Sequence, residues 1–98
     1  MPSGVMGSPT VRVLAADDHR DTADTTADLL RMDGHEVVVA YDGVQAVAAA
    51  RVFRPHVAVL DISMPGLNGY QVAAALREMD LAGSRLVLIA HTARTEPV

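Results

Sequence analysis

Four short apolar segments alternate along this chain with three segments in which apolar residues recur at helical spacing. The apolar segments are residues 11–16, 35–40, 56–60 and 85–90. Their nearly continuous content of Val, Leu, Ile and Ala predicts parallel strands that are covered on both faces. The segments with helical periodicity are residues 21–32, 44–53 and 70–79. This alternation predicts an α/β fold built on an open parallel sheet.

Residues with known effects on helix ends support these boundaries. Gly34 follows the first helix, as a C-terminal glycine does, and Pro55 prevents continuation of the second. Asp42 precedes the second helix and can serve as its N-cap. The apolar positions that recur in that second helix are Val44, Val47, Ala48 and Val52. Those that share a stripe in the third are Val72, Leu76 and Met79.

Carboxylates follow two of the predicted strands. Asp17 and Asp18 come directly after the first, and Asp61 comes directly after the third. If these strands are neighbours, the three carboxylates converge in one crevice at the carboxyl edge of the sheet. Two carboxylates about 4 Å apart repel by about 4 kcal/mol at an effective dielectric constant of about 20. A hard divalent cation such as Mg²⁺ would remove this repulsion.

Composition limits the partners and compartments that are expected. The net charge of −4 argues against a nucleic acid or an anionic membrane as the main partner. The longest apolar runs are too short to span a membrane, and no cysteine is present for disulfides or thiolate metal sites. These features favour a cytoplasmic protein. Residues 1–10 lack the features of a signal peptide and are expected to form a flexible lead-in.

Several short motifs occur in order along the chain, and each is weak by itself. They are the acidic pair at 17–18, "GHEV" at 34–37, "DG" at 42–43, "LDISMPGLNGY" at 60–70 and Thr92-Ala93. With these motifs at the right spacing, the sequence resembles the receiver domain of bacterial two-component response regulators. The resemblance implies a flavodoxin-like receiver fold over residues 11–98, with strand order 2-1-3-4 and a site between strands 1 and 3.

The resemblance also implies a role for each matching residue. Asp61 would be the phosphoacceptor, because carboxylates can form aspartyl-phosphates. Mg²⁺, or Mn²⁺ in its place, would be held by Asp18 directly and by Asp17 through water. Asp61 and the backbone carbonyl of Ser63 would complete its ligands. Thr92 would supply the hydroxyl that moves toward the phosphoryl group.

The residues after Asp61 are expected to set the geometry of a loop. Pro65 and Gly66 turn the chain sharply away from the strand, and Gly69 allows a close approach before the next helix. This break keeps the carboxylate accessible. The four histidines lie far apart without the spacing of metal ligands, and surface or loop positions are expected for them.

The function that follows is acceptance of a phosphoryl group from a histidine kinase or a phosphotransfer protein. Enzymatic turnover beyond slow self-dephosphorylation is not expected. A phosphatase of the haloacid-dehalogenase type would need a second aspartate where Ser63 stands. A nucleotide- or flavin-binding module would need a glycine-rich loop after the first strand, and "AADDHRD" is acidic there.

One alternative remains, a non-switching pseudo-receiver that acts as a protein-interaction module. A receiver normally continues with a fourth helix, a fifth strand that ends in a lysine, and a last helix. This sequence ends at "TARTEPV" and contains no lysine, so we expect a receiver that is incomplete at its C-terminus. The apolar strand at 85–90 would then be an unprotected edge, through which a homodimer is expected to form.

Overall fold

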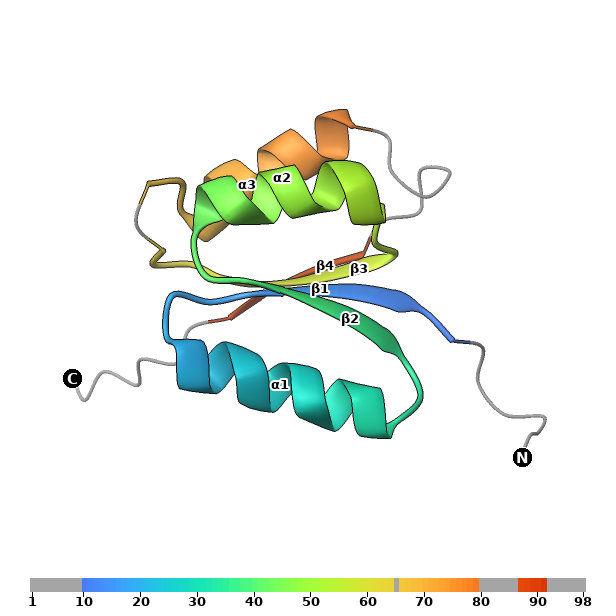
Figure 1. Cartoon of the computed structure of the whole chain (residues 1–98). Coiled ribbons are helices and arrows are strands. Elements are labelled where there is room, and N and C mark those ends of the chain that lie inside the picture. The colour runs from blue at the N-terminus through green and yellow to red at the C-terminus, as the bar shows by residue number, and fades with distance from the viewer. Residues whose placement is uncertain (1–9, 65, 80–86, 92–98) are drawn as a thin grey trace.

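The predicted alternation of strands and helices is present in the computed structural model of the chain, which describes residues 10–64, 66–79 and 87–91. Figure 1 shows the elements within these ranges. The strands are β1 (Arg12–Ala16), β2 (Glu36–Ala40), β3 (Val57–Asp61) and β4 (Val87–His91). The helices are α1 (Arg20–Met32), α2 (Gly43–Phe53) and α3 (Gly69–Glu78). The expected order of elements is confirmed.

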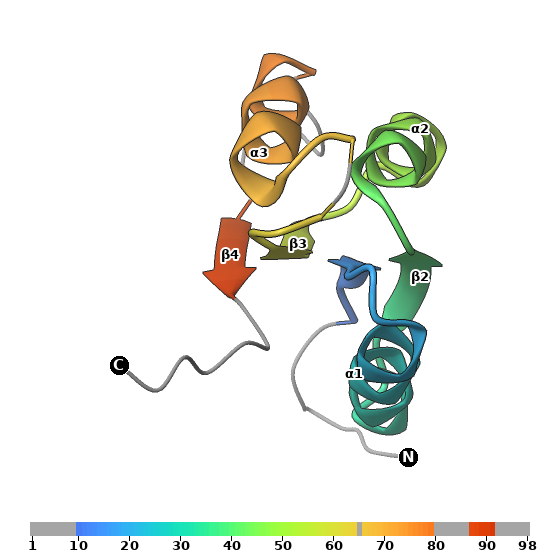
Figure 2. The same cartoon turned by 90° about the vertical axis from the view of Figure 1, so that its left-hand side faces the viewer.

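The strands form one open parallel sheet with the order β2-β1-β3-β4. Helix α1 covers one face of this sheet, and α2 and α3 cover the other (Figures 1 and 2). The open parallel sheet with strand order 2-1-3-4 predicted from the sequence is therefore confirmed. Strand β1 lies between β2 and β3, so the chain changes direction across the sheet at β1, where such sheets place their sites.

The core lies on both faces of the sheet, as the nearly continuous apolar strands predict. Leu14 and Ala16 of β1 face the cluster under α2 and α3. Val13 and Ala15 face the cluster under α1, which includes Ala27. This alternation follows from the two-residue period of a strand. Because β1 is buried on both faces, its end at Ala16 is fixed in position.

The face of α2 that packs on the sheet differs from the apolar stripe identified in the sequence. Val44 and Val52 are exposed, with 61% and 87% of their surface accessible. The buried positions of this helix are Gly43, Ala46 and Ala50, which lie three and seven residues apart along one stripe. Their small side chains let the helix approach the sheet closely. The stripe of valines therefore predicted the helix correctly, but not its orientation.

Local hydrogen bonds fix the helix starts beside the site. The carboxylate of Asp42 accepts a hydrogen bond from the backbone N of Gln45 at 2.7 Å, as expected for an N-cap. Asn68 and Gln71 form a reciprocal capping box at the start of α3. These caps place the first turns of α2 and α3 at the carboxyl edge of the sheet. At the other edge, Gly34 lies just beyond α1 and has a φ of +95°.

The sheet edge at β4 is described only in part. Among the described residues β4 pairs with β3, and Ile89 is 46% exposed. The homodimer through this strand stays a prediction. The expected lead-in also lies almost wholly outside the described residues. Among the helices described over residues 10–79, none has the length and hydropathy needed to cross a membrane.

Candidate functional site

The carboxylates that follow β1 and β3 come together at the carboxyl edge of the sheet. Ala16 pairs with Leu60 in the register of these two strands, so Asp17 and Asp61 occupy the next position on each. Asp17, Asp18, His19 and Asp61 each offer one ligand atom, and these atoms all lie within 4.8 Å of one another. The convergence of three carboxylates follows from the pairing of β1 with β3.

Asp17 is the most constrained member of this cluster. Only 2% of its surface is accessible. Its Oδ1 atom accepts a hydrogen bond from the backbone N of His19 at 2.9 Å. Its Oδ2 atom is buried and has no hydrogen-bond partner in the described structure. A buried carboxylate oxygen without a partner is unfavourable, and a bound cation would satisfy it.

Asp61 is equally buried and is held by the loop that follows it. Its accessible surface is 2%, and its Oδ1 atom accepts a hydrogen bond from the backbone N of Ser63 at 3.2 Å. The backbone of Gly69 lies directly against β3, and a Cβ atom there would be 2.6 Å from the Asp61 carbonyl oxygen. Gly66 has a φ of +81°. The loop geometry around Asp61 therefore depends on both glycines.

Two of the residues assigned by resemblance cannot be placed. Pro65 and Thr92 lie outside the described residues. Ser63 is exposed beside Asp61, and Asp18 is exposed at the rim of the cluster. The structure thus brings together the side chains of three of the predicted ligands. Ser63 contacts Asp61 through its backbone N–H, and the role of its carbonyl as a metal ligand stays a prediction.

His19 is a member of the cluster that the spacing of the histidines did not reveal. Its Nδ1 atom lies 3.3 Å from Asp17 Oδ1 and 3.2 Å from Asp18 Oδ1. It is a surface residue, as expected, and it lies beside the acidic pair. The signal was present in the sequence as direct adjacency, "DDH", at the end of a buried strand.

Two other histidines have structural roles. Nδ1 of His35 accepts a hydrogen bond from the backbone N of Val11 at 3.3 Å, and Nδ1 of His56 accepts one from Arg12 at 3.0 Å. Both bonds lie near the start of β1, at the opposite end of the strand from Asp17. The side chain of His91 is not described.

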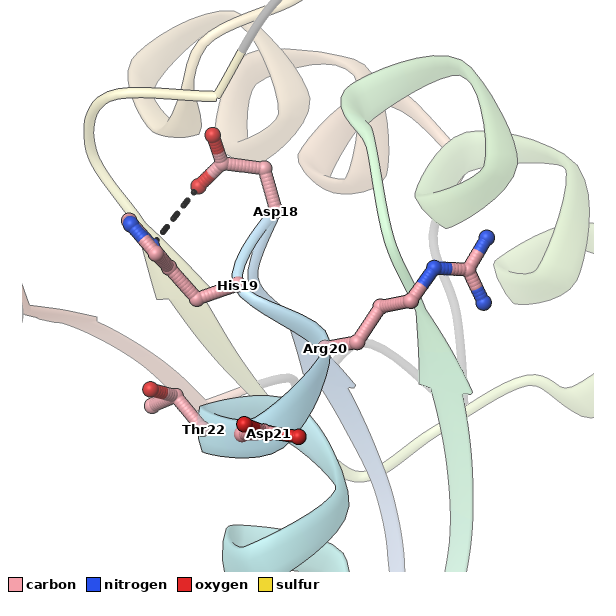
Figure 3. A pocket seen from close by; sticks show the side chains of 5 residues that line it. All are labelled: Asp18, His19, Arg20, Asp21 and Thr22. Carbon is pink, nitrogen blue, oxygen red and sulfur yellow. Dashed lines mark ion pairs between the residues drawn. The ribbon is translucent and has the colours of Figure 1, made fainter.

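Arg20 lies next in sequence to the cluster but is directed away from it. Its guanidinium carbon is 4.1 Å from the ring centroid of Tyr41. The Tyr41 hydroxyl donates a hydrogen bond to Asp24 Oδ1 at 2.7 Å, and this bond raises the pKa of Tyr41 above its usual value. Figure 3 shows Asp18 and His19 facing each other in a surface depression while Arg20 points to the other side.

Among the described residues, arginine does not neutralise the acidic cluster of Asp17, Asp18 and Asp61. Within the described residues, the ion pairs of Asp17 and Asp18 are those with His19, and no arginine pairs with either residue or with Asp61. The donor set is three carboxylates and one imidazole. Carboxylate oxygens are the ligands that Mg²⁺ and Mn²⁺ prefer. The geometry therefore fits a divalent cation.

Comparisons with known proteins agree with this fold. The family model described as "Response regulator receiver domain" matches residues 13–98. A curated relative, the DNA-binding response regulator MtrA of Mycobacterium tuberculosis (strain ATCC 25618 / H37Rv), is 37% identical over 87 residues. The match covers 89% of this chain and 36% of MtrA, so the chain spans about a third of the length of that relative.

Two solved structures are similar to this chain in fold. The chemotaxis protein CheY4 of Vibrio cholerae has a TM-score of 0.78 and 28% identity, with 91% of this chain and 73% of that chain covered. The receiver domain of sensor histidine kinase PA1611 from Pseudomonas aeruginosa PAO1 has a TM-score of 0.76 and 29% identity, with 88% and 70% covered. The PA1611 structure is described as having a magnesium ion coordinated in its active-site cleft.

Proposed function

Because the chain belongs to the response regulator receiver domain family of two-component systems, we propose that it accepts one phosphoryl group on Asp61. The donor is a phosphohistidine on a histidine kinase or on a phosphotransfer protein. The observation that carries this proposal is the position of Asp61. It ends a buried strand, and Asp17 and Asp18 offer ligand atoms within 4.8 Å of its own.

The proposed transfer is a displacement at phosphorus. An Oδ atom of Asp61 attacks the phosphorus, and the new O–P bond forms as the N–P bond of the phosphohistidine breaks. The released imidazole then takes up a proton from water. The backbone N–H of Ser63 holds Oδ1 of Asp61, which orients the carboxylate and leaves Oδ2 as the nucleophile. Thr92 is assigned the hydroxyl that contacts the transferred group.

Mg²⁺ is the proposed cofactor, with Mn²⁺ as an alternative. Asp17, Asp18, Asp61 and the carbonyl of Ser63 would hold it, since these groups supply oxygen ligands. When bound, Mg²⁺ supplies positive charge that neutralises the phosphoryl oxygens. The buried Oδ2 atom of Asp17, which has no partner within the part of the chain that the structure describes, supports this assignment, because a cation would compensate its burial.

The proposed partners are therefore proteins that carry phosphohistidine, and the proposed compartment is the cytoplasm. MtrA is described as DNA-binding, but this chain matches only about a third of its length. With a net charge of −4, this chain is not proposed to bind nucleic acid itself.

Phosphorylation of the purified chain tests the proposal. We expect that acetyl phosphate or phosphoramidate with Mg²⁺ adds one phosphoryl group, measured by intact mass spectrometry. Asp61→Asn should abolish the addition, because an amide cannot act as the nucleophile. Asp33→Asn is the matched control, since Asp33 is exposed at the opposite end of α1 and should not affect labelling.

Two results of this phosphorylation experiment would contradict the proposal. If the wild-type chain stays unlabelled while it binds Mg²⁺ and unfolds cooperatively, the chain is a non-switching pseudo-receiver. Equal labelling of Asp61→Asn and of the wild type would place the phosphoryl group on another residue.

A second prediction concerns Mg²⁺ without phosphate. A ligand that binds only the folded state at ten times its Kd stabilises that state by about 1.4 kcal/mol. For a domain of this size, we expect a rise in Tm of about 6–11 °C. Asp18→Ala should abolish the rise, because it removes the exposed carboxylate of the cluster. Scanning calorimetry in EDTA and in excess Mg²⁺ measures both values, and identical curves for the wild type would exclude a metal site.

A further inference from the structure

We propose that His19 is a fourth side-chain ligand of the metal site, so that the site takes borderline first-row divalent ions such as Co²⁺ and Zn²⁺ through a nitrogen donor. This inference rests on the metal site of the proposed function and extends its donor set. Imidazole is a good ligand for such ions and a poor one for Mg²⁺, which prefers oxygen. The choice of metal would then depend on one residue beside the acidic pair.

The distances around His19 match those between ligands of one ion. Nδ1 lies 3.3 Å from Asp17 Oδ1 and 3.2 Å from Asp18 Oδ1. Two ligand atoms that are each about 2.1 Å from a metal lie about 3.0–3.4 Å apart at octahedral or tetrahedral angles. The nitrogen therefore lies at the spacing from each of the two oxygens that a shared ion requires, and all ligand atoms of the cluster lie within 4.8 Å of one another.

The side chain of His19 is not used to stabilise the helix that it precedes. His19 is the N-cap residue of α1, a position where Ser, Thr, Asp and Asn are preferred because their side chains accept a backbone hydrogen bond. The His19 side chain makes no such capping bond. Its ring instead faces Asp18, as Figure 3 shows. Helix stability therefore does not account for histidine at this position.

A second, independent observation concerns Asp17, whose carboxylate belongs to the same cluster. The Oδ2 atom of Asp17 is buried without a hydrogen-bond partner in the described structure, and Asp17 as a whole is 2% exposed. Oδ1 of the same carboxylate faces His19. One ion shared by this carboxylate and the imidazole would compensate the buried charge and use the nitrogen.

The other histidines with described side chains are not available in this way. Nδ1 of His35 and Nδ1 of His56 each accept a hydrogen bond from backbone. His19 is therefore the histidine, among those described, whose Nδ1 faces carboxylates. This difference supplies a matched control for the experiment.

The experiment compares the affinities of the chain for Co²⁺ and for Mg²⁺ by isothermal titration calorimetry at one fixed pH. For His19→Asn we expect at least a tenfold loss of Co²⁺ affinity and a change in Mg²⁺ affinity of less than about threefold. Asparagine is a preferred N-cap residue, so this variant should fold at least as well as the wild type. His35→Asn removes an imidazole outside the cluster and should leave both affinities unchanged.

NMR spectroscopy adds a measurement that distinguishes a metal ligand from a residue with a purely structural role. With ¹⁵N-labelled histidine, Zn²⁺ should shift the Nδ1 resonance of His19, while Mg²⁺ should shift it much less. If His19→Asn changes the two affinities by the same factor, including no change, His19 is not a ligand. If the wild type binds no Mg²⁺, the metal part of the proposed function fails instead, so the two failures are distinguishable.

Discussion

Gly43→Ala is expected to destabilise the domain by about 3 kcal/mol or more, the upper end of overpacking effects. A Cβ atom at Gly43 would overlap the carbonyl oxygen of Leu67 and lie 2.5 Å from its Cβ atom. Because two of the three nearest atoms belong to the backbone, a rotamer change cannot relieve the clash. Leu67 lies in the loop between Asp61 and α3, so relief of the clash must move either this loop or the start of α2, and movement of the loop would weaken the site as well.

Gly34 and Gly66 serve as controls, because alanine at these positions would strain the backbone without causing a steric clash. Gly34 and Gly66 have φ values of +95° and +81°, and a Cβ atom there would meet either nothing within 4 Å or one atom at 3.9 Å. Alanine at either position should therefore cost about 1–2 kcal/mol through backbone strain alone. Urea unfolding of the three variants measures the difference. A value for Gly43→Ala no larger than the other two would show that α2 does not pack on Leu67 as described.

The contact of Gly43 also shows what periodicity in a sequence can establish about a helix. The spacing of Val44, Val47 and Val52 predicted α2 correctly, because any apolar recurrence near 3.6 residues favours a helix. The same spacing could not show which face of α2 packs on the sheet, since a second stripe of small residues runs through Ala46 and Ala50. Close packing against Leu67 decides between the two, and that contact is between residues far apart in the sequence.

The strand order has a similar limit. Four parallel strands joined by helices can be ordered in several ways, and the order 2-1-3-4 was inferred from the resemblance to receivers. Once β1 and β3 are neighbours, the meeting of Asp17 with Asp61 follows from the register of Ala16 with Leu60. The carboxylate cluster was therefore accessible to sequence reasoning.

The rest of the site depends on local turns that the sequence does not specify. His19 reaches the cluster because its backbone N donates to Asp17 and its ring turns toward Asp18. Arg20 is kept away by Tyr41, which belongs to the β2–α2 turn and lies twenty-one residues later in the chain. The spacing between histidines does not reveal His19, because its contacts with Asp17 and Asp18 do not involve another histidine.

The cluster of Asp17, Asp18 and Asp61 is the basis of the second prediction with a large effect, a substitution at Asp17. Asp17→Asn is expected to stabilise the metal-free protein by about 1–3 kcal/mol, because it removes one buried charge from a group of three carboxylates. Each carboxylate pair at about 4 Å repels by about 4 kcal/mol at an effective dielectric constant of about 20. Part of this gain is offset by the weaker hydrogen bonds that a neutral acceptor makes.

Asparagine suits the position of Asp17 for a further reason. Its side-chain oxygen can still accept the hydrogen bond from the backbone N of His19, which aspartate accepts at 2.9 Å. Its NH₂ group would replace the buried Oδ2 atom, which has no partner within the described residues, and could donate to a neighbouring carboxylate. The substitution therefore replaces a buried acceptor, which has no partner among the described residues, with a hydrogen-bond donor.

The same substitution should nearly abolish stabilisation by Mg²⁺, since the cation would lose a ligand and part of the charge that attracts it. Urea unfolding in EDTA and in excess Mg²⁺ gives both effects from one pair of curves. Asp33→Asn, an exposed change at the far end of α1, should shift stability by less than about 0.5 kcal/mol and leave the response to Mg²⁺ intact. If Asp17→Asn instead lowers stability in EDTA, the three carboxylates do not repel one another in the folded protein. A cation at this edge of the sheet would then have no repulsion between carboxylates to relieve.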